Sequence, residues 1–148
     1  FNLTKNSAAD AQHLAAEFLV RLKPGVNRKP LPALNLATDI STITACSNDL
    51  SFAKLFSRNL EAFGLNGDIL IVISSSGDSK NILEVLKKAR QKKIFSIAFL
   101  GKSGGKAKKL SDLPLLIKSN NIATIQEVHI FLGHYIFESV ENKILNRL

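Results

Sequence analysis

The stretch DILIVISSSGDSKNILEVLKKARQKKIFSIAFL, residues 68–100, decides the fold. Residues 68–73 and 94–100 form largely apolar runs rich in β-branched side chains, which are typical of strands covered on both faces. Between them lies an amphipathic helix that begins at Ser79. A strand, a helix and a second strand in this order predict a right-handed crossover between two parallel strands, with helices packed on the sheet.

The rest of the chain continues this alternation of helices and strands. Residues 7–22 (SAADAQHLAAEFLVRL) predict a helix with Ser7 in the N-cap position, and residues 51–63 (SFAKLFSRNLEAF) predict a helix with one apolar face. The other expected elements are a strand at 33–37, a Thr/Ser-rich connection after it, a short helix at 106–110, a strand at 114–118 and a helix from about Ala123 to the end. Together they predict an α/β fold in a single domain over residues 1–148, namely a three-layer αβα sandwich with a parallel, Rossmann-like sheet.

Composition limits the classes of protein to consider. The chain has 148 residues, of which 45% are hydrophobic, as expected for one soluble domain with a sizeable core. The longest apolar run, Ile69–Ile73, is too short to cross a bilayer, and the first residues lack a secretory signal, so we expect a cytoplasmic protein. The single Cys46 excludes a disulfide within the chain and is expected to be buried. Because the chain opens on FNL and contains no methionine, we expect an N-terminal helical segment to be missing.

Charge points to an anionic partner without identifying it. The net charge is +8, and lysines cluster in LKKARQKK (86–93) and GKSGGKAKK (101–109). Neither cluster contains interleaved aromatic residues or a recognisable nucleic-acid motif. We therefore interpret them as solvated basic surface and do not expect nucleic acid to be the partner.

The serine-rich segment ISSSGDS, residues 73–79, is the first candidate binding site. It follows a strand and precedes a helix, so backbone N–H groups, the positive end of the helix dipole and several hydroxyls converge at one point. Ligands in α/β folds bind beyond the carboxyl ends of the strands. These features predict an anion site; alternatively, Ser79 only caps its helix and the other serines fill a turn.

The two terminal helices hold the remaining polar candidates. The final helix is apolar around most of its circumference, which favours a partner subunit as its cover, and against this background Gln126, His129 and His134 stand out. A lone histidine there is typical of a satisfied core residue as well as of a ligand. In the first helix, His13 and Glu17 are four residues apart and share a face beside Asp10. Such a pair can supply two ligands of a metal site or form a local ion pair.

Six segments together resemble the phosphoheptose isomerases of the sugar isomerase (SIS) family. The resemblance implies a helix-flanked sheet, a homotetramer with active sites between subunits, and interconversion of sedoheptulose 7-phosphate and D-glycero-D-manno-heptose 7-phosphate for bacterial lipopolysaccharide or capsule. The segments, in chain order, are SAADAQHLAAE (7–17), RKPLPALNLATDIS (28–41), SND (47–49), LFSRNLEAFGLNGDILIVISSSGDS (55–79), FLGKSGGK (99–106) and IQEVHIFLGH (125–134).

The resemblance also implies roles for individual residues. Glu17 and His134 match the family's acid/base pair, which moves protons between carbon and oxygen as the carbonyl shifts between C1 and C2. Positions that bind one zinc ion per subunit in some members are matched by His13, Glu17, Gln126 and His134. The positions that bind the substrate phosphate in the family are matched by Ser74, Ser75, Ser76 and Ser79. Other substrate-binding positions are matched by Ser7, Glu17, Asn48, Asp49 and Gln126.

Two non-catalytic functions remain as alternatives. A tetrameric family member that acts in replication initiation lacks the glutamate and the last histidine, whereas this chain keeps Glu17 and His134. A sugar-phosphate-sensing module would keep only the serine-rich segment. The sequence also departs from the family's pattern: LTKNS stands in place of a glycine-rich first loop, Asp78 replaces a common asparagine, and Ala123-Thr124 stands where an arginine often occurs. The retained acid/base pair favours the enzyme.

Overall fold

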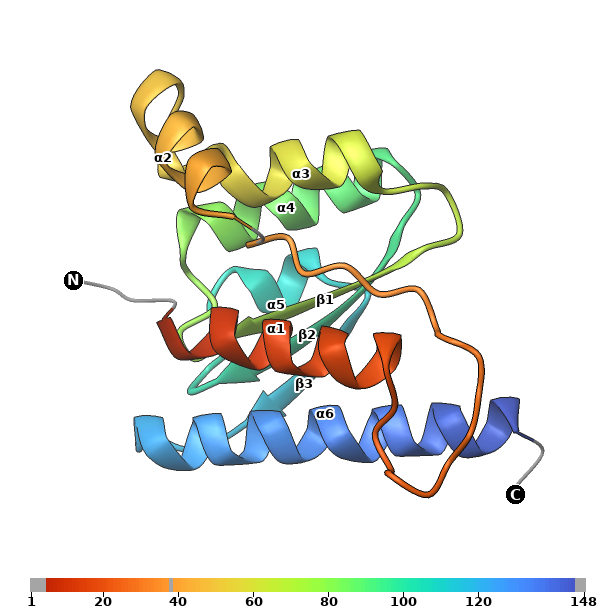
Figure 1. Ribbon diagram of the computed structural model, residues 1–148. Helices are drawn as coiled ribbons and strands as arrows, with labels where there is room; N and C mark the ends of the chain where they lie inside the picture. The colour runs from red at the N-terminus through yellow and green to blue at the C-terminus, as the bar shows by residue number, and fades with distance from the viewer. Residues whose placement is uncertain (1–4, 38, 146–148) are drawn as a thin grey trace.

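The computed structural model describes residues 5–37 and 39–145, and Figure 1 shows a sheet between two layers of helices. The sheet has three parallel strands in the order β1 (Ile69–Ser74), β2 (Phe95–Gly101) and β3 (Leu113–Ile117). Helix α4 (Lys80–Gln91) connects β1 to β2, and the short helix α5 (Ala107–Leu110) lies between β2 and β3. The predicted crossover and parallel sheet are therefore confirmed.

Helices cover both faces of the sheet (Figure 1), and the short helix α5 lies on the same face as α3 (Leu55–Phe63) and α4. On that face, Leu86 of α4 packs with Ala98 and Leu100 of β2. Helices α1 (Lys5–Leu19) and α6 (Ile122–Ile144) cover the other, where Leu14 and Phe137 pack with Phe99. Side chains of alternate residues of β2 thus pack into two separate hydrophobic cores, one on each face of the sheet. This arrangement is the predicted αβα sandwich.

The predicted bounds of the first helix are wrong at both ends. Helix α1 includes Lys5, so Ser7 lies within the helix and is not its N-cap. It ends at Leu19, three residues before the expected end. The reason is that hydrogen bonds from outside the helix, donated by Arg28 and by the Leu31 amide, take up its last carbonyl groups.

Residues 33–37 and the connection after them also differ from expectation. Residues 33–37 form no strand, because side chains satisfy their backbone groups: the amide of Ala37 donates to Asn35 Oδ1 (3.0 Å), and Asn59 Nδ2 donates to the Leu36 carbonyl (2.7 Å). The Thr/Ser-rich connection contains a helix, α2 (Ile40–Asp49). Its N-cap is Asp39, whose carboxylate accepts from the Thr42 amide at 2.6 Å.

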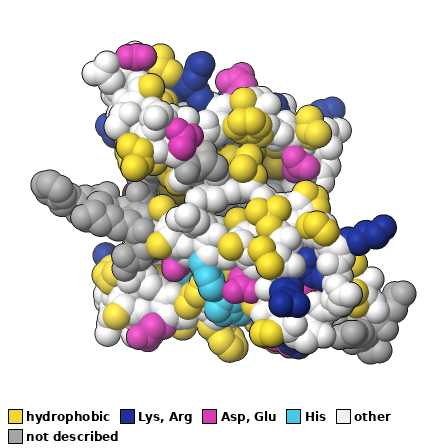
Figure 2. Space-filling view, viewed as in Figure 1, with side chains coloured by type: hydrophobic (Ala, Val, Ile, Leu, Met, Phe, Trp, Pro, Cys, Tyr) yellow, Lys and Arg dark blue, Asp and Glu magenta, His cyan; other side chains and the backbone are white. Residues whose placement is uncertain are grey.

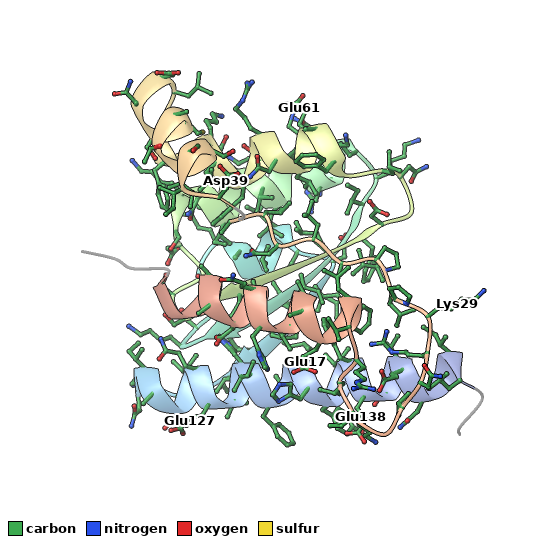
Figure 3. All side chains as sticks on the ribbon, viewed as in Figure 1. Glu17, Lys29, Asp39, Glu61, Glu127 and Glu138 are labelled. Atoms are coloured by element: carbon green, nitrogen blue, oxygen red, sulfur yellow. The ribbon has the colours of Figure 1, made fainter. Side chains whose placement is uncertain are left out.

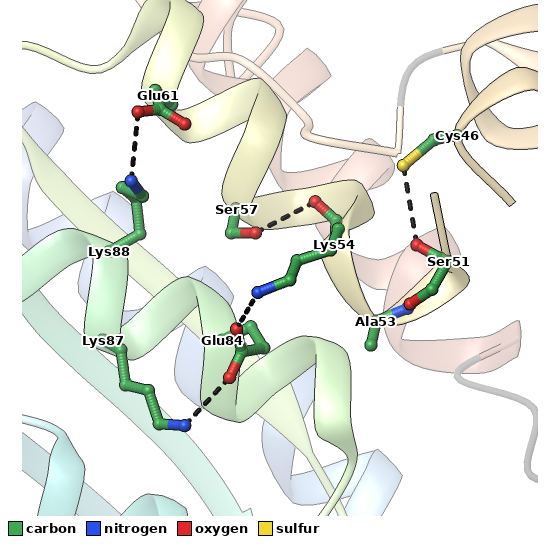
Figure 4. Close-up of polar contacts among 9 residues, drawn as sticks. All are labelled: Cys46, Ser51, Ala53, Lys54, Ser57, Glu61, Glu84, Lys87 and Lys88. Atoms are coloured by element: carbon green, nitrogen blue, oxygen red, sulfur yellow. Dashed lines mark hydrogen bonds and ion pairs between the residues drawn. The ribbon is translucent and has the colours of Figure 1, made fainter. Parts of the chain in front are cut away.

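The expected segment 51–63 begins with a 3₁₀ turn, η1 (Phe52–Lys54), and continues as α3. Cys46 is buried, as predicted, and its thiol donates to the Ser51 carbonyl at 3.6 Å (Figure 4). Among residues 5–37 and 39–145, none of the helices combines the length and apolarity that a bilayer crossing requires.

Part of the first lysine cluster is neutralised within the fold (Figure 4). Glu84 binds Lys54 at 2.5 Å and Lys87 at 2.9 Å, and Lys88 binds Glu61 at 3.1 Å. Hydrogen bonds from Lys54 and then Lys87 lower the pKa of Glu84 to about 2. These pairs accord with a solvated basic surface, and the absence of a nucleic-acid partner stays a prediction.

Candidate active site

The serine-rich segment lies at the carboxyl end of β1 and leads directly into α4, as expected for an anion site. Ser74 is buried, and its Oγ accepts a hydrogen bond from the Gly77 amide at 3.1 Å. The Asp78 amide donates to Ser76 Oγ at 3.3 Å. Ser79 occupies the N-cap position of α4 without making a capping hydrogen bond through its side chain. The alternative in which its hydroxyl serves the cap is therefore not observed.

A second loop, residues 102–106, holds this segment in place. Gly77 has a φ of +70°, and a Cβ at this position would lie 2.0 Å from the Gly104 carbonyl oxygen, so only glycine fits. The Ala107 amide donates to the Gly77 carbonyl at 2.9 Å. Asp78 accepts from the Lys106 amide at 3.0 Å, so the carboxylate that departs from the family's asparagine ties the two loops together.

A cluster of three polar side chains forms where α1 packs alongside α6. His13 Nε2 lies 2.9 Å from His134 Nε2 and 3.6 Å from Glu17 Oε1. Figure 3 places Glu17 on the side of α1 that faces α6, and Figure 2 shows histidines at the surface of this face beside acidic side chains. The Glu17 side chain is 21% exposed and that of His13 48%, so a substrate can reach both. The sequence predicted all three residues, and the fold brings them together.

Close packing of the two helices sets the geometry of this cluster. Leu14 fills the space above Gly133: a Cβ at Gly133 would lie only 2.6 Å from Leu14 Cδ1. The rings of Phe18 and Phe137 follow at a centroid distance of 4.1 Å. Because Leu14 and Gly133 directly neighbour His13 and His134 in the chain, the absence of a side chain at Gly133 allows the imidazoles to meet.

Two further titratable side chains lie near this interface. Burial raises the pKa of Asp10, an effect partly offset by His13. Burial lowers the pKa of His129, which is fully buried beside Phe99. The Leu100 backbone opposes this shift, although neither ring nitrogen of His129 makes a hydrogen bond of ordinary geometry with a described residue. His129 is thus a core residue, which is one of the two alternatives that the sequence left open, but its ring nitrogens lack ordinary hydrogen bonds to the described residues.

The cluster fits a metal ion. The ligand atoms of His13, Glu17 and His134 all lie within 4.8 Å of one another. Tetrahedral zinc with ligands at about 2.0–2.2 Å requires ligand atoms roughly 3.3–3.5 Å apart, and the observed 2.9 and 3.6 Å bracket that spacing. Gln126 lies on α6 two turns before His134, and its part in such a site stays a prediction. The separation of His13 and Glu17 is equally compatible with an ion pair.

Three predicted substrate contacts, Asn48, Asp49 and Ser7, lie outside the three-residue cluster. Asn48 and Asp49 end α2 and bond to each other, Nδ2 to Oδ1, at 3.0 Å. Figure 1 shows α2 beside α3 and α4, across the sheet from α1 and α6. Ser7 lines a cavity of about 650 Å³ between α1, residues 32–37 and β1, whose walls are mainly apolar. Within this single chain, these residues do not join the three-residue cluster.

Comparisons with known proteins give consistent matches. A model of the SIS domain family matches residues 4–101. The phosphoheptose isomerase of Paramagnetospirillum magneticum is 50% identical over 135 residues, covering 91% of this chain and 69% of that protein. That of Clostridium acetobutylicum is 45% identical over 138 residues, covering 93% and 69%. The solved phosphoheptose isomerase of Neisseria gonorrhoeae superposes with a TM-score of 0.86 at 37% identity, covering 95% of this chain and 73% of that one.

Proposed function

The chain belongs to the SIS domain family and within it to the phosphoheptose isomerases, and on that premise we propose that its serine-rich segment and its His13–Glu17–His134 cluster form one isomerase site. The protein is a phosphosugar isomerase that interconverts sedoheptulose 7-phosphate and D-glycero-D-manno-heptose 7-phosphate for heptose biosynthesis. The observation that carries the site is that two imidazoles and a carboxylate meet between α1 and α6, although His13 and His134 are 121 residues apart in the chain.

Glu17 is the group that moves the carbon-bound proton. It takes a proton from C1 of the ketose, which leaves an enediol, and returns a proton to C2 to give the aldose. His134 exchanges the proton between O1 and O2, so that no net proton is gained or lost. The 2.9 Å contact between the Nε2 atoms of His13 and His134 requires one imidazole to donate and the other to accept.

The serine-rich segment holds the phosphate end of the sugar. The amides of the first turn of α4, which have no acceptor within the helix, and the hydroxyls of Ser75, Ser76 and Ser79 are the donors, and Ser74 fixes the turn through Gly77. Phosphate binding positions the substrate and leaves the proton transfers to the two other helices.

The same cluster fits zinc. His13, Glu17 and His134 would hold the ion together with Gln126, and bound zinc would polarise the substrate carbonyl as a Lewis acid. Elemental analysis of the purified protein, with His13→Ala as the comparison, tests this assignment. We expect close to one zinc per subunit in the wild type and a clear loss in the variant; equal content in both would contradict it.

Assembly completes the site. Phe131 and Tyr135 of α6 are 64% and 61% exposed and stack on each other at 6.4 Å, a surface that supports a partner subunit as cover. The sugar contacts expected of Asn48 and Asp49 lie across the sheet from the cluster, so a neighbouring subunit is needed to bring both to one substrate. We therefore propose a homotetramer with active sites between subunits. Its location in the cytoplasm stays a prediction.

The function is tested by incubating the full-length protein with sedoheptulose 7-phosphate and following the aldose product by NMR. We expect conversion by the wild type, none by Glu17→Gln, and far slower conversion of unphosphorylated sedoheptulose. A folded tetramer that converts neither sugar, with zinc supplied, would contradict the proposal and favour a binding or sensing role.

A further inference from the structure

Arg28 is a buried cation that lies in the loop after α1 and contacts three parts of the fold. Its side chain is only 3% exposed, and its Nε donates to Oε1 of Glu141 on α6, which is itself 1% exposed. One terminal nitrogen donates to the Phe18 carbonyl (2.9 Å) and the Lys29 carbonyl (3.1 Å), and the other donates to the Glu17 carbonyl (2.9 Å). A single guanidinium thus joins the end of α1 to α6.

The hydrogen bonds from Arg28 satisfy backbone carbonyl groups at the end of α1 that have no donor within the helix. The last carbonyls of α1 have no partner within the helix, and the negative end of its dipole lies there. The Val20 amide bonds to Ala16, and the Leu31 amide shares Phe18 with Arg28. The Glu17 carbonyl is bonded by Arg28. Arg28 therefore fixes the backbone of the residue whose carboxylate belongs to the three-residue cluster.

Stability alone does not explain this pair. The desolvation penalty of burying two charges can exceed the free energy gained from their attraction, and apolar side chains of similar size often stabilise a fold as well or better. Glu141 also keeps a second oxygen, Oε2, buried without a hydrogen-bond partner among the described residues. What the ion pair provides and an apolar pair would not is directional bonding to the α1 carbonyls.

We propose that the Arg28–Glu141 pair positions Glu17 against His134. Glu141 lies seven residues after His134, two turns along the same side of α6. These contacts form a closed circuit. His13 contacts both Glu17 and His134, and α6 carries both His134 and Glu141. Arg28 then binds the Glu141 carboxylate and the backbone carbonyl of Glu17. This role rests on the proposed isomerase site and adds two positioning residues to it.

The test separates stability from positioning. Arg28→Met leaves the Glu141 charge buried and unpaired, so we expect a lowered melting temperature and a kcat about 10- to 100-fold lower, the loss usual when support of a site residue is removed. KM for sedoheptulose 7-phosphate should change by less than about threefold, because the phosphate segment is untouched. The double variant Arg28→Met/Glu141→Leu should recover the melting temperature but not kcat.

Two further variants and a second measurement complete the design. Glu141→Gln keeps an oxygen acceptor for Arg28 and should lose much less kcat than Arg28→Met. The double variant Lys23→Met/Glu138→Leu removes an ion pair that also joins the loop after α1 to α6 but is 44% and 43% exposed, and it should behave as the wild type. Cobalt(II), added to metal-free protein and followed by its visible absorption, should bind about 10- to 100-fold more weakly to the Arg28 variants than to the wild type.

A stable Arg28→Met/Glu141→Leu variant with wild-type kcat and cobalt affinity would overturn the proposal, since the pair would then be only structural. If Arg28→Met does not fold, the double variant and Glu141→Gln still decide. Failure of the isomerase function would appear differently, as wild-type protein without activity, and cobalt affinity would still report whether the pair positions the cluster.

Discussion

Replacing Gly133 by alanine should separate activity from stability in this enzyme. The added Cβ would lie 2.6 Å from Leu14 Cδ1, 2.8 Å from Cδ2 and 3.2 Å from Cγ. Favourable carbon contacts begin at about 3.5 Å, so α1 and α6 must separate by about 1 Å or Leu14 must leave its position. Because Leu14 adjoins His13 and Gly133 adjoins His134, separation of the two helices widens the 2.9 Å contact between the imidazoles.

The two consequences differ in size. Overpacking of a buried contact costs about 1–3 kcal/mol, and the better helix propensity of alanine returns about 1 kcal/mol, so the free energy of unfolding should fall by only about 0–2 kcal/mol. Misplacement of a reacting group by about 1 Å can lower the rate by about 100-fold. We therefore expect kcat to fall about 100-fold while the protein stays folded.

Steady-state kinetics with sedoheptulose 7-phosphate and urea unfolding measure the two effects. Gly25→Ala is the matched control, because a Cβ there has no neighbour within 4 Å, and it should keep wild-type kcat. Adding Leu14→Val to Gly133→Ala removes the two closest carbons and should restore part of kcat. Wild-type kcat in Gly133→Ala would refute the idea that this helix contact sets the site.

Three other predictions test the site and the core. Glu17→Gln and His134→Ala should each abolish isomerisation yet leave the oligomer intact by light scattering; turnover at the wild-type rate would remove the catalytic assignment. Ser74→Ala/Ser76→Ala should mainly weaken phosphate-dependent binding, which equal affinity for sugar and sugar phosphate would contradict. Burial lowers the pKa of His129, so below about pH 6.5 the unfolded state binds a proton on this imidazole that the folded state does not. The free energy of unfolding should therefore decrease as the pH is lowered, by up to about 1.4 kcal/mol per pH unit. In urea unfolding, His129→Leu should reduce this dependence of stability on pH.

Local sequence patterns predicted the centre of the fold well. The β1–α4–β2 unit was readable because both strands are apolar and the helix between them is amphipathic. Helix α2 was missed because its threonines and serines are weak helix formers and its N-cap, Asp39, gave the only local signal. Residues 33–37 resemble a strand in composition. They form none, because hydrogen bonds from Asn59 and within the segment satisfy their backbone groups.

In the site, too, local sequence patterns predicted contacts within one helix but not contacts between segments far apart in the chain. The four-residue spacing of His13 and Glu17 indicated a shared helix face, but only the family resemblance linked them to His134, since the packing of α1 on α6 has no local pattern. Arg28 and Glu141 were not predicted at all. They lie 113 residues apart, and neither has a sequence context that distinguishes it from a surface charge.

The most direct test of the shared site is a crystal structure of the assembled Glu17→Gln variant with sedoheptulose 7-phosphate. We expect the phosphate on the amides and hydroxyls of residues 74–79, and C1 and C2 in contact with the substituted side chain at position 17 and with His134, with both sets drawn from one subunit or from two neighbours. Phosphate bound elsewhere, or a sugar whose reacting carbons touch neither helix in any subunit, would contradict the account.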